Sequence, residues 1–172
     1  MNPMREIEVE KITLNVGVGK PGAELDKAKK LLEYVSGAKP IETKATNRIP
    51  TWGIRPGLAI GAKVTLRGEK AEALLKRLLG AVDNKLLPSK FDKQGNFAFG
   101  IKEYIDIPDL NYEVDLGILG FEIAVTLRRP GFRSKLRRIR SKSIPQRHRI
   151  SKEDAIAFAK KKLGIKVEED LA

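Results

Sequence analysis

Three segments of this chain carry apolar residues at every second position, with polar residues between them. The segments are Lys11–Val16, Lys63–Arg67 and Phe121–Leu127, and Ile101–Ile107 is a fourth, less regular candidate. Such alternation is typical of strands that have one face on a hydrophobic core and the other in water. The pattern therefore predicts an open sheet, antiparallel or mixed, rather than a sheet that is buried on both faces.

Three other segments have apolar residues at the spacing of a helix face. They are Ala23–Val35, Glu69–Val82 and a segment that begins at Ser151 and stops at Gly164. Asp154 follows Ser151 by three positions, which is a pattern that caps a helix N-terminus. Helices beside one-sided strands predict an α+β fold, with the helices packed on one face of the sheet and the other face open.

Two long segments, Thr43–Gly61 and Asp83–Gly100, show neither period. Long loops without regular structure inside a compact domain are mostly functional or mobile. In the first loop Arg48 and Arg55 flank the chain's single tryptophan, Trp52. Basic side chains beside an exposed aromatic ring suit an RNA backbone and a stacked base. The alternative is that Trp52 anchors the loop to the body of the protein.

The positive charge is concentrated in the stretch Arg128–Lys152, which contains no acidic residue. This stretch holds 11 of the 34 lysines and arginines, and the rest of the chain holds 23 against 22 acidic residues. Nucleic acid is the expected partner, because each phosphate that is contacted releases a counterion, and we expect the stretch to fold on its RNA. The alternative is a solvated, disordered tail. The expected contacts are Arg133, Arg137, Arg138, Arg140, Arg147 and Arg149.

Several classes of function are excluded by residues that the chain lacks. It has no cysteine and one histidine, His148, which we assign to an RNA-contacting surface rather than to a catalytic pair. Gly17–Gly22 matches the dinucleotide pattern G-x-G-x-x-G, but Pro21 removes a backbone donor and the preceding strand alternates. We therefore expect no cofactor, metal or small-molecule substrate. The chain also has no apolar run that could cross a membrane.

The polar faces of the first two strands would lie together if these strands pair. They would present amide and hydroxyl groups bracketed by cations, which suits the shape, sugar hydroxyls and phosphates of RNA. The alternative is an ordinary solvated sheet face. The residues concerned are Lys11, Thr13, Asn15, Lys63, Thr65 and Arg67.

Four sequence blocks resemble one family of ribosomal proteins. The blocks are LNVGVGK (Leu14–Lys20), SGAKP (Ser36–Pro40), TKATNRIPTWGIRPGLAIGAKVTLRG (Thr43–Gly68) and FDKQGNFAFGIKEYIDIP (Phe91–Pro108). In this order they closely resemble the 5S-rRNA-binding family of the large subunit, number five in the universal nomenclature. The resemblance covers essentially the whole chain. The basic extension Arg128–Arg149 is similar to the archaeal and eukaryotic branch.

The resemblance implies a structural, non-catalytic role in the cytoplasmic ribosome. The implied partners are 5S rRNA, large-subunit rRNA, P-site tRNA and other ribosomal proteins of the central protuberance. In the family the open sheet face binds 5S rRNA, and Asn15 and Thr65 match two of its contact positions. A third position, glutamine in many members, is Ala38 here, which shifts its role to neighbours such as Lys39 and Lys44.

The same resemblance assigns separate roles to parts of the chain. The loop Thr43–Gly57 matches the family's projection toward P-site tRNA and an intersubunit bridge, with Arg48, Trp52 and Arg55 as the expected contacts. We expect residues 1–127 to form an RNA-binding body from which loop 43–61 projects. We expect residues 128–172 to form a basic extension that binds the large rRNA, followed by a C-terminal helix packed on the body.

Overall fold

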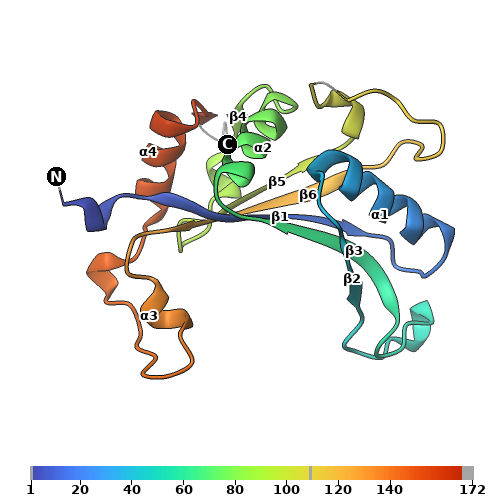
Figure 1. The fold of residues 1–172 in the computed structure, drawn as a ribbon, viewed down its shortest axis with the longest axis horizontal. Coiled ribbons are helices and arrows are strands. Elements are labelled where there is room, and N and C mark those ends of the chain that lie inside the picture. The colour runs from blue at the N-terminus through green and yellow to red at the C-terminus, as the bar shows by residue number, and fades with distance from the viewer. Residues whose placement is uncertain (1, 109, 168–172) are drawn as a thin grey trace.

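The computed structural model describes residues 2–108 and 110–167 and has an antiparallel sheet of five strands in the order β2-β3-β1-β6-β5. Helices α1, α2 and α4 lie on one side of this sheet (Figure 1). The predicted α+β fold with one covered face is confirmed. The elements are β1 (Glu8–Gly17), α1 (Ala23–Ser36), β2 (Ile41–Lys44), β3 (Ala59–Leu66), α2 (Glu69–Gly80), β4 (Lys85–Leu86), β5 (Phe97–Ile101), β6 (Phe121–Arg128), α3 (Arg133–Leu136), α4 (Lys152–Lys162) and β7 (Lys166–Val167).

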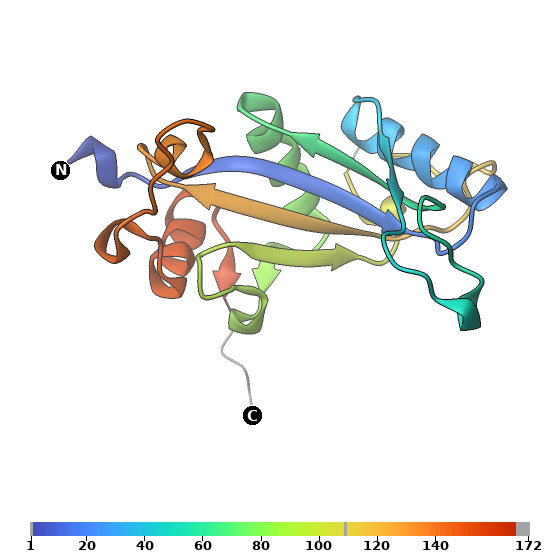
Figure 2. The same ribbon diagram turned by 90° about the horizontal axis from the view of Figure 1, so that it is seen from below.

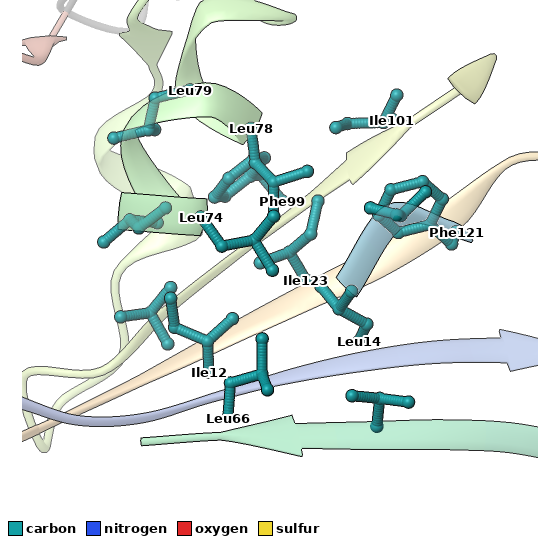
Figure 3. Close-up of a cluster of buried hydrophobic side chains, with 14 of the residues drawn as sticks. Ile12, Leu14, Leu66, Leu74, Leu78, Leu79, Phe99, Ile101, Phe121 and Ile123 are labelled. Carbon is teal, nitrogen blue, oxygen red and sulfur yellow. The ribbon is translucent and has the colours of Figure 1, made fainter. Parts of the chain in front are cut away.

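The core lies between the sheet and the helices, where the apolar positions of the strands meet leucine-rich helix faces. On β1, Ile12 and Leu14 are 1% and 0% exposed. Leu74 and Leu78 of α2 pack above them, together with side chains of β5 and β6 (Figure 3). Burying one such side chain contributes about 1.5–3 kcal/mol. The period-two pattern therefore fixes which face of the sheet is covered.

The helix ends follow from local sequence. Helix α1 ends at Ser36 and is capped by Gly37, which has a φ of +63° and donates its N–H to the carbonyl oxygen of Glu33 at 2.8 Å. Helix α4 begins at Lys152 and is capped by Ser151, whose hydroxyl accepts the Asp154 N–H at 3.1 Å, while the Asp154 carboxylate accepts the Ser151 N–H at 3.3 Å. These predicted termini are confirmed. Helix α2 ends at Gly80, slightly before the predicted Val82.

The prediction of a strand at Ile101–Ile107 is wrong. The strand in this region is β5, Phe97–Ile101, and the following Tyr104–Asp106 forms a 3-10 turn. Two short strands, β4 and β5, lie within or overlap Asp83–Gly100, which was expected to lack regular structure. The alternation in β5 is faint because its outward positions, Ala98 and Gly100, are small rather than polar.

The chain beyond β6 folds back onto the body. Arg129 is 9% exposed, and its guanidinium donates to the Asp154 carboxylate at 2.9 Å and to the Arg149 carbonyl oxygen at 3.1 Å. Gly95 lies directly against Ile150, since a Cβ on Gly95 would overlap the Ile150 side chain. Residues of α4 belong to the same core cluster as the sheet. In the described part of the chain, no helix is both long and apolar enough to span a membrane.

Candidate nucleic-acid interface

The open face of the sheet is built by the pairing of β1 with β3 and β6. Thr13 lies opposite Thr65 on β3, and Asn15 lies opposite Lys63. A bulge between Val9 and Lys11 shifts the register of β1 against β6. The predicted meeting of the polar faces of the first two strands is therefore present. These residues offer hydroxyl, amide and ammonium groups on a surface that no helix covers (Figure 2).

The other half of this face was missed in the sequence because it consists mainly of small residues. Ala124 of β6 lies opposite Thr13 on one side and Ala98 of β5 on the other. Glu122 lies opposite Asn15 and beside Gly100. Small side chains leave a low, flat surface, which fits the wide, shallow minor groove of an RNA helix. Glu122 adds a hydrogen-bond acceptor to this surface.

Three of the expected sheet contacts lie at its margin rather than on the paired rows. Arg67 is exposed and follows the last residue of β3, near Glu8, Glu10 and Glu69. Lys39 precedes the edge strand β2 and Lys44 is its last residue, and both are exposed.

Ala38 lies beside these margin residues and is partly buried. Its backbone N–H donates to the Ser36 hydroxyl at 3.2 Å, and its side chain packs against the core. Ala38 therefore serves packing at this edge of the sheet.

The edge strand β2 is tied to α1 by one charged side chain. Lys29 on α1 is 2.8 Å from both Asp26 and Glu42. Hydrogen bonds from Lys29 to Asp26 and Glu42 raise the pKa of Lys29 to about 12. Its hydrogen bond to Asp26 lowers the pKa of that carboxyl. The Lys29–Glu42 pair joins α1 to the strand that leads into the projecting loop, whereas the Lys29–Asp26 pair lies within α1.

The loop between β2 and β3 is an ordered hairpin rather than a structureless segment. Ala45 and Leu58 are joined by a backbone hydrogen bond of 2.8 Å, and Ile49 and Ile54 exchange two, at 3.0 and 3.1 Å. A 3-10 turn at Pro50–Trp52 forms its tip. Hydrogen bonds within the loop define its structure. They leave no period-two or helical pattern in the sequence, so the pattern did not predict this order.

Trp52 is 69% exposed at the tip of this loop, so the alternative that it anchors the loop to the body is wrong. Arg48 and Arg55 are exposed on either side of it in sequence. An exposed indole flanked by two guanidinium groups can stack on a base while the arginines contact phosphates.

Some cations of the basic extension make contacts within the protein, and others have exposed side chains. Arg129 is internal, as described above, and Arg149 uses its Nε to donate to the Ile144 carbonyl oxygen at 3.2 Å. His148 is half-buried, its Nε2 is 3.0 Å from the Pro130 carbonyl oxygen, and its ring meets Phe132 edge-on. Among the predicted phosphate contacts, Arg133, Arg137, Arg138, Arg140 and Arg147 are exposed, as is the side chain of Arg149.

The residues after α3 form a closed basic loop. The Lys142 N–H donates to the Ser134 carbonyl oxygen at 3.1 Å, and the Ser141 hydroxyl donates to that of Lys135 at 3.2 Å. At the tip, the Arg137 Nε donates to the Arg140 carbonyl oxygen at 2.7 Å, and Arg140 has a φ of +54°. The loop thus displays its arginines on a defined backbone.

Two segments project from the sheet: the β2–β3 loop and the segment of the basic extension that contains α3. Both lie on the side opposite helices α1, α2 and α4, and at opposite ends of the long strands (Figure 1). The open face lies between them, with α3 at one end and the β2–β3 loop at the other (Figure 2). A polyanion on this face would meet cations at both ends. The geometry therefore joins three separately predicted surfaces into one side of the molecule.

The Gly17–Gly22 segment does not form a nucleotide site. The backbone N–H groups of Val18 and Gly19 both donate to the Ile60 carbonyl oxygen, at 2.9 and 2.8 Å, so they are not free for a phosphate. Strand β1 has antiparallel neighbours on both sides, unlike the first strand of a dinucleotide-binding sheet. Among residues 2–108 and 110–167, no group of His, Asp and Glu is arranged to hold a metal ion.

Comparison with known proteins identifies the family. Residues 2–55 match the family model described as ribosomal protein L5, and residues 59–158 match the model for the C-terminus of the same ribosomal family. The chain belongs to the ribosomal protein L5 family. Members of this family are structural ribosomal proteins and not enzymes, which confirms the interpretation of the four sequence blocks.

Archaeal relatives cover nearly the whole chain. The large ribosomal subunit protein uL5 of Nanoarchaeum equitans is 52% identical over 167 residues, covering 96% of this chain and 98% of the relative. That of Sulfurisphaera tokodaii is 46% identical, covering 98% and 96%. That of Methanosphaera stadtmanae is 42% identical, covering 98% and 100%. The L5 family similarity therefore includes the basic extension.

Proposed function

We propose that the chain is a structural component of the large ribosomal subunit that binds 5S rRNA through the open face of its sheet. The observation that carries this proposal is the uncovered face itself, on which Thr13, Asn15, Lys63 and Thr65 are brought together by strand pairing. As a ribosomal protein it acts in the cytoplasm, on the ribosome. Helices pack on the other face, so the protein can lie flat on RNA without losing its core.

The two projections take the other RNA partners. The β2–β3 loop contacts P-site tRNA through Arg48, Trp52 and Arg55, all of which are exposed at or near its tip. The basic extension contacts the large rRNA and so attaches the 5S particle to the subunit, where it helps to form the central protuberance with other ribosomal proteins. Both projections lie on the RNA side of the sheet, which supports this division (Figure 1).

The roles of the side chains follow from their chemistry. Asn15 and Thr65 offer hydrogen bonds to sugar hydroxyls and base edges, which discriminate between RNA structures. Lys11 and Lys63 neutralise phosphates on the face, with Lys39, Lys44 and Arg67 at its margin. No group undergoes reaction in this proposal, because the protein positions RNA and performs no chemistry.

Binding of 5S rRNA to two alanine variants tests the proposal. Asn15→Ala and Thr65→Ala should each weaken binding by about 1–2 kcal/mol, the cost of a hydrogen bond lost from a buried interface. Asn47→Ala and Thr46→Ala are the matched controls, because both residues are exposed in the projecting loop. Equal affinity of all four variants and the wild type would remove the open face from the 5S contact.

A further inference from the structure

A hollow of about 410 Å³ lies between the start of β1 and the first turn of the basic extension. Its lining includes Phe132 and Leu136, together with Arg128, Arg133, Glu8 and Glu10. Its volume falls within the range of sites that enclose small ligands, about 300–1,000 Å³. The hollow lies at the end of the sheet where Glu8 of β1 pairs with Arg128 of β6, away from the rows that contain Thr13 and Asn15.

The composition of this lining is unusual for the most basic part of the chain. The stretch Arg128–Lys152 contains no acidic residue, yet Glu8 and Glu10 of β1 line the hollow that it forms. The Glu8 carboxylate lies 3.5 Å from the Arg128 guanidinium. Carboxylates repel phosphate but accept hydrogen bonds from the amino and imino groups of nucleobases. A plain phosphate site would have no use for them.

The apolar part of the lining points to the same ligand. Leu136 is 69% exposed at the rim of the hollow, although it lies among arginines. The Phe132 ring is partly buried and is fixed edge-on against His148, with ring centroids 5.9 Å apart. Aromatic and aliphatic side chains receive bases that have left an RNA stack.

We propose that this hollow holds an unpaired nucleotide of the RNA bound by the basic extension. The base lies between Phe132 and Leu136, and a carboxylate of Glu8 or Glu10 accepts a hydrogen bond from its edge. Arg133 contacts the adjoining phosphate. This inference rests on the proposed RNA contact of the extension and adds to it a preference for RNA structure, which charge alone does not provide.

Two RNA hairpins that are identical except for one unpaired adenosine in the stem test this site. Binding is measured by fluorescence anisotropy over a range of salt concentrations. Wild-type protein should prefer the bulged hairpin. Leu136→Ser should weaken binding to that hairpin by about fivefold to tenfold, through loss of apolar contact. Binding to the paired hairpin, and the salt dependence of both, should stay unchanged because no charge is removed.

Two further variants keep the test independent of folding. Val114→Ser is the matched control, because Val114 is 80% exposed and lies outside the basic extension. Glu10→Gln should also reduce the preference for the bulge, without truncating an apolar side chain. In a third hairpin, in which 4-thiouridine replaces the unpaired adenosine, this nucleotide should cross-link to residues 128–136 of the wild type. Cross-links confined to the sheet face or to the β2–β3 loop would refute the assignment.

The outcomes separate this inference from the proposed function. If Arg137→Gln/Arg138→Gln/Arg140→Gln weakens binding to both hairpins while Leu136→Ser has no effect, the hollow is not a nucleotide site but the extension still binds RNA. If the triple variant also binds both hairpins like the wild type, the RNA contact of the extension and the nucleotide site fail together. Equal affinity of the wild type for the two hairpins would likewise overturn the inference.

Discussion

Arginines that are indistinguishable in the sequence have different roles in the folded chain. Arg128 and Arg129 are adjacent, yet Arg128 is exposed beside Glu8 whereas Arg129 is buried between Asp154 and the Arg149 carbonyl. The Arg129 Nε is buried and has no hydrogen-bond partner among the residues that the structure describes, so this residue already bears a cost of burial. Arg129 therefore fastens the extension to α4, and the RNA-facing charge comes from the exposed arginines.

Replacing Arg129 should destabilise the fold, whereas replacing an exposed neighbour should not. Arg129→Met should lower the free energy of unfolding by about 1–3 kcal/mol, because it removes the hydrogen bonds that join residue 129 to the Asp154 carboxylate and the Arg149 carbonyl oxygen. Arg138→Met should change it by less than about 0.5 kcal/mol, as surface substitutions do. Urea unfolding of both variants provides the measurement. Equal stability of the two would mean that the Arg129 contacts contribute nothing.

Replacing Trp52 should impair function and leave stability unchanged, whereas replacing Arg129 should reduce stability. Because its side chain is 69% exposed, Trp52→Ala should leave the free energy of unfolding unchanged within about 0.5 kcal/mol. The same substitution should weaken tRNA binding to the P site of reconstituted ribosomes, because stacking on a base contributes about 1–3 kcal/mol. Thr51→Ala, an exposed neighbour in the same turn, is the control. A stability loss without a change in tRNA binding would restore the anchoring role.

At the scale of elements, patterns that repeat along one segment were predictable and contacts between segments were not. The one-sided strands and the ends of α1 and α4 follow from alternation, from Gly37 and from the Ser151–Asp154 cap. Strand β5 was missed because its outward residues are small. The β2–β3 loop gave no periodic signal because its order depends on hydrogen bonds across the hairpin.

The ion pairs of Lys29, one of which links α1 to β2, should make the stability of the fold depend on pH. Because the folded-state pKa of Lys29 is raised to about 12, its stabilising contribution is present below its unfolded pKa and is lost as the pH rises toward the folded value. The pKa of Asp26 is lowered, so its contribution is present above its unfolded pKa and is lost on acidification. Lys29→Met should therefore differ most from the wild type between these limits.

Urea unfolding of Lys29→Met and the wild type at about pH 3, 7 and 11 measures this difference, which should be largest at neutral pH. It should shrink in high salt, because these groups are exposed. Lys27→Met is the control, since Lys27 is exposed on the same helix and takes no part in the two ion pairs. A difference that stays constant at all three values would show that Lys29 acts through packing alone.

The basic loop after α3 should set the salt dependence of RNA binding. If about six cations of the extension engage phosphates, log K should fall with log salt with a slope of about −5. Arg137→Gln/Arg138→Gln/Arg140→Gln should reduce this slope by about two to three, because up to three phosphate contacts are lost. Titration of an rRNA fragment at several salt concentrations gives the slope. An unchanged slope would place the phosphate contacts elsewhere on the protein.

At the scale of the whole molecule, one hydrophobic core joins parts that we propose to serve different RNAs. Ile150, Ala155 and Ala159, all beyond residue 128, are buried in the same cluster as the sheet. The division at residues 127 and 128 is thus proposed as one of function: the body binds 5S rRNA and the extension binds the large rRNA. A truncation before Arg128 would uncover the core, so charge substitutions test the extension more cleanly.

The family and the fold class could be predicted from the sequence, and the arrangement of the site only in part. Four sequence blocks were enough to predict the family, and the alternating strands beside helical segments were enough to predict the fold class. The pairing of Asn15 with Lys63 and Glu122 depends on strand order, which alternation does not encode. The internal use of Arg129 and His148 depends on contacts between residues 18 to 25 positions apart.

The most direct test of the central claim is a competition titration of 5S rRNA against a structured RNA of equal length. It compares the wild type, Asn15→Ala and the triple Arg137, Arg138 and Arg140 to Gln variant. We predict a strong preference of the wild type for 5S rRNA. Asn15→Ala should reduce this preference by about tenfold, the equivalent of 1–2 kcal/mol, and the triple variant should keep it while binding both RNAs more weakly. Equal affinity of the wild type for the two RNAs, reduced only in the triple variant, would contradict the account and leave a general polyanion binder.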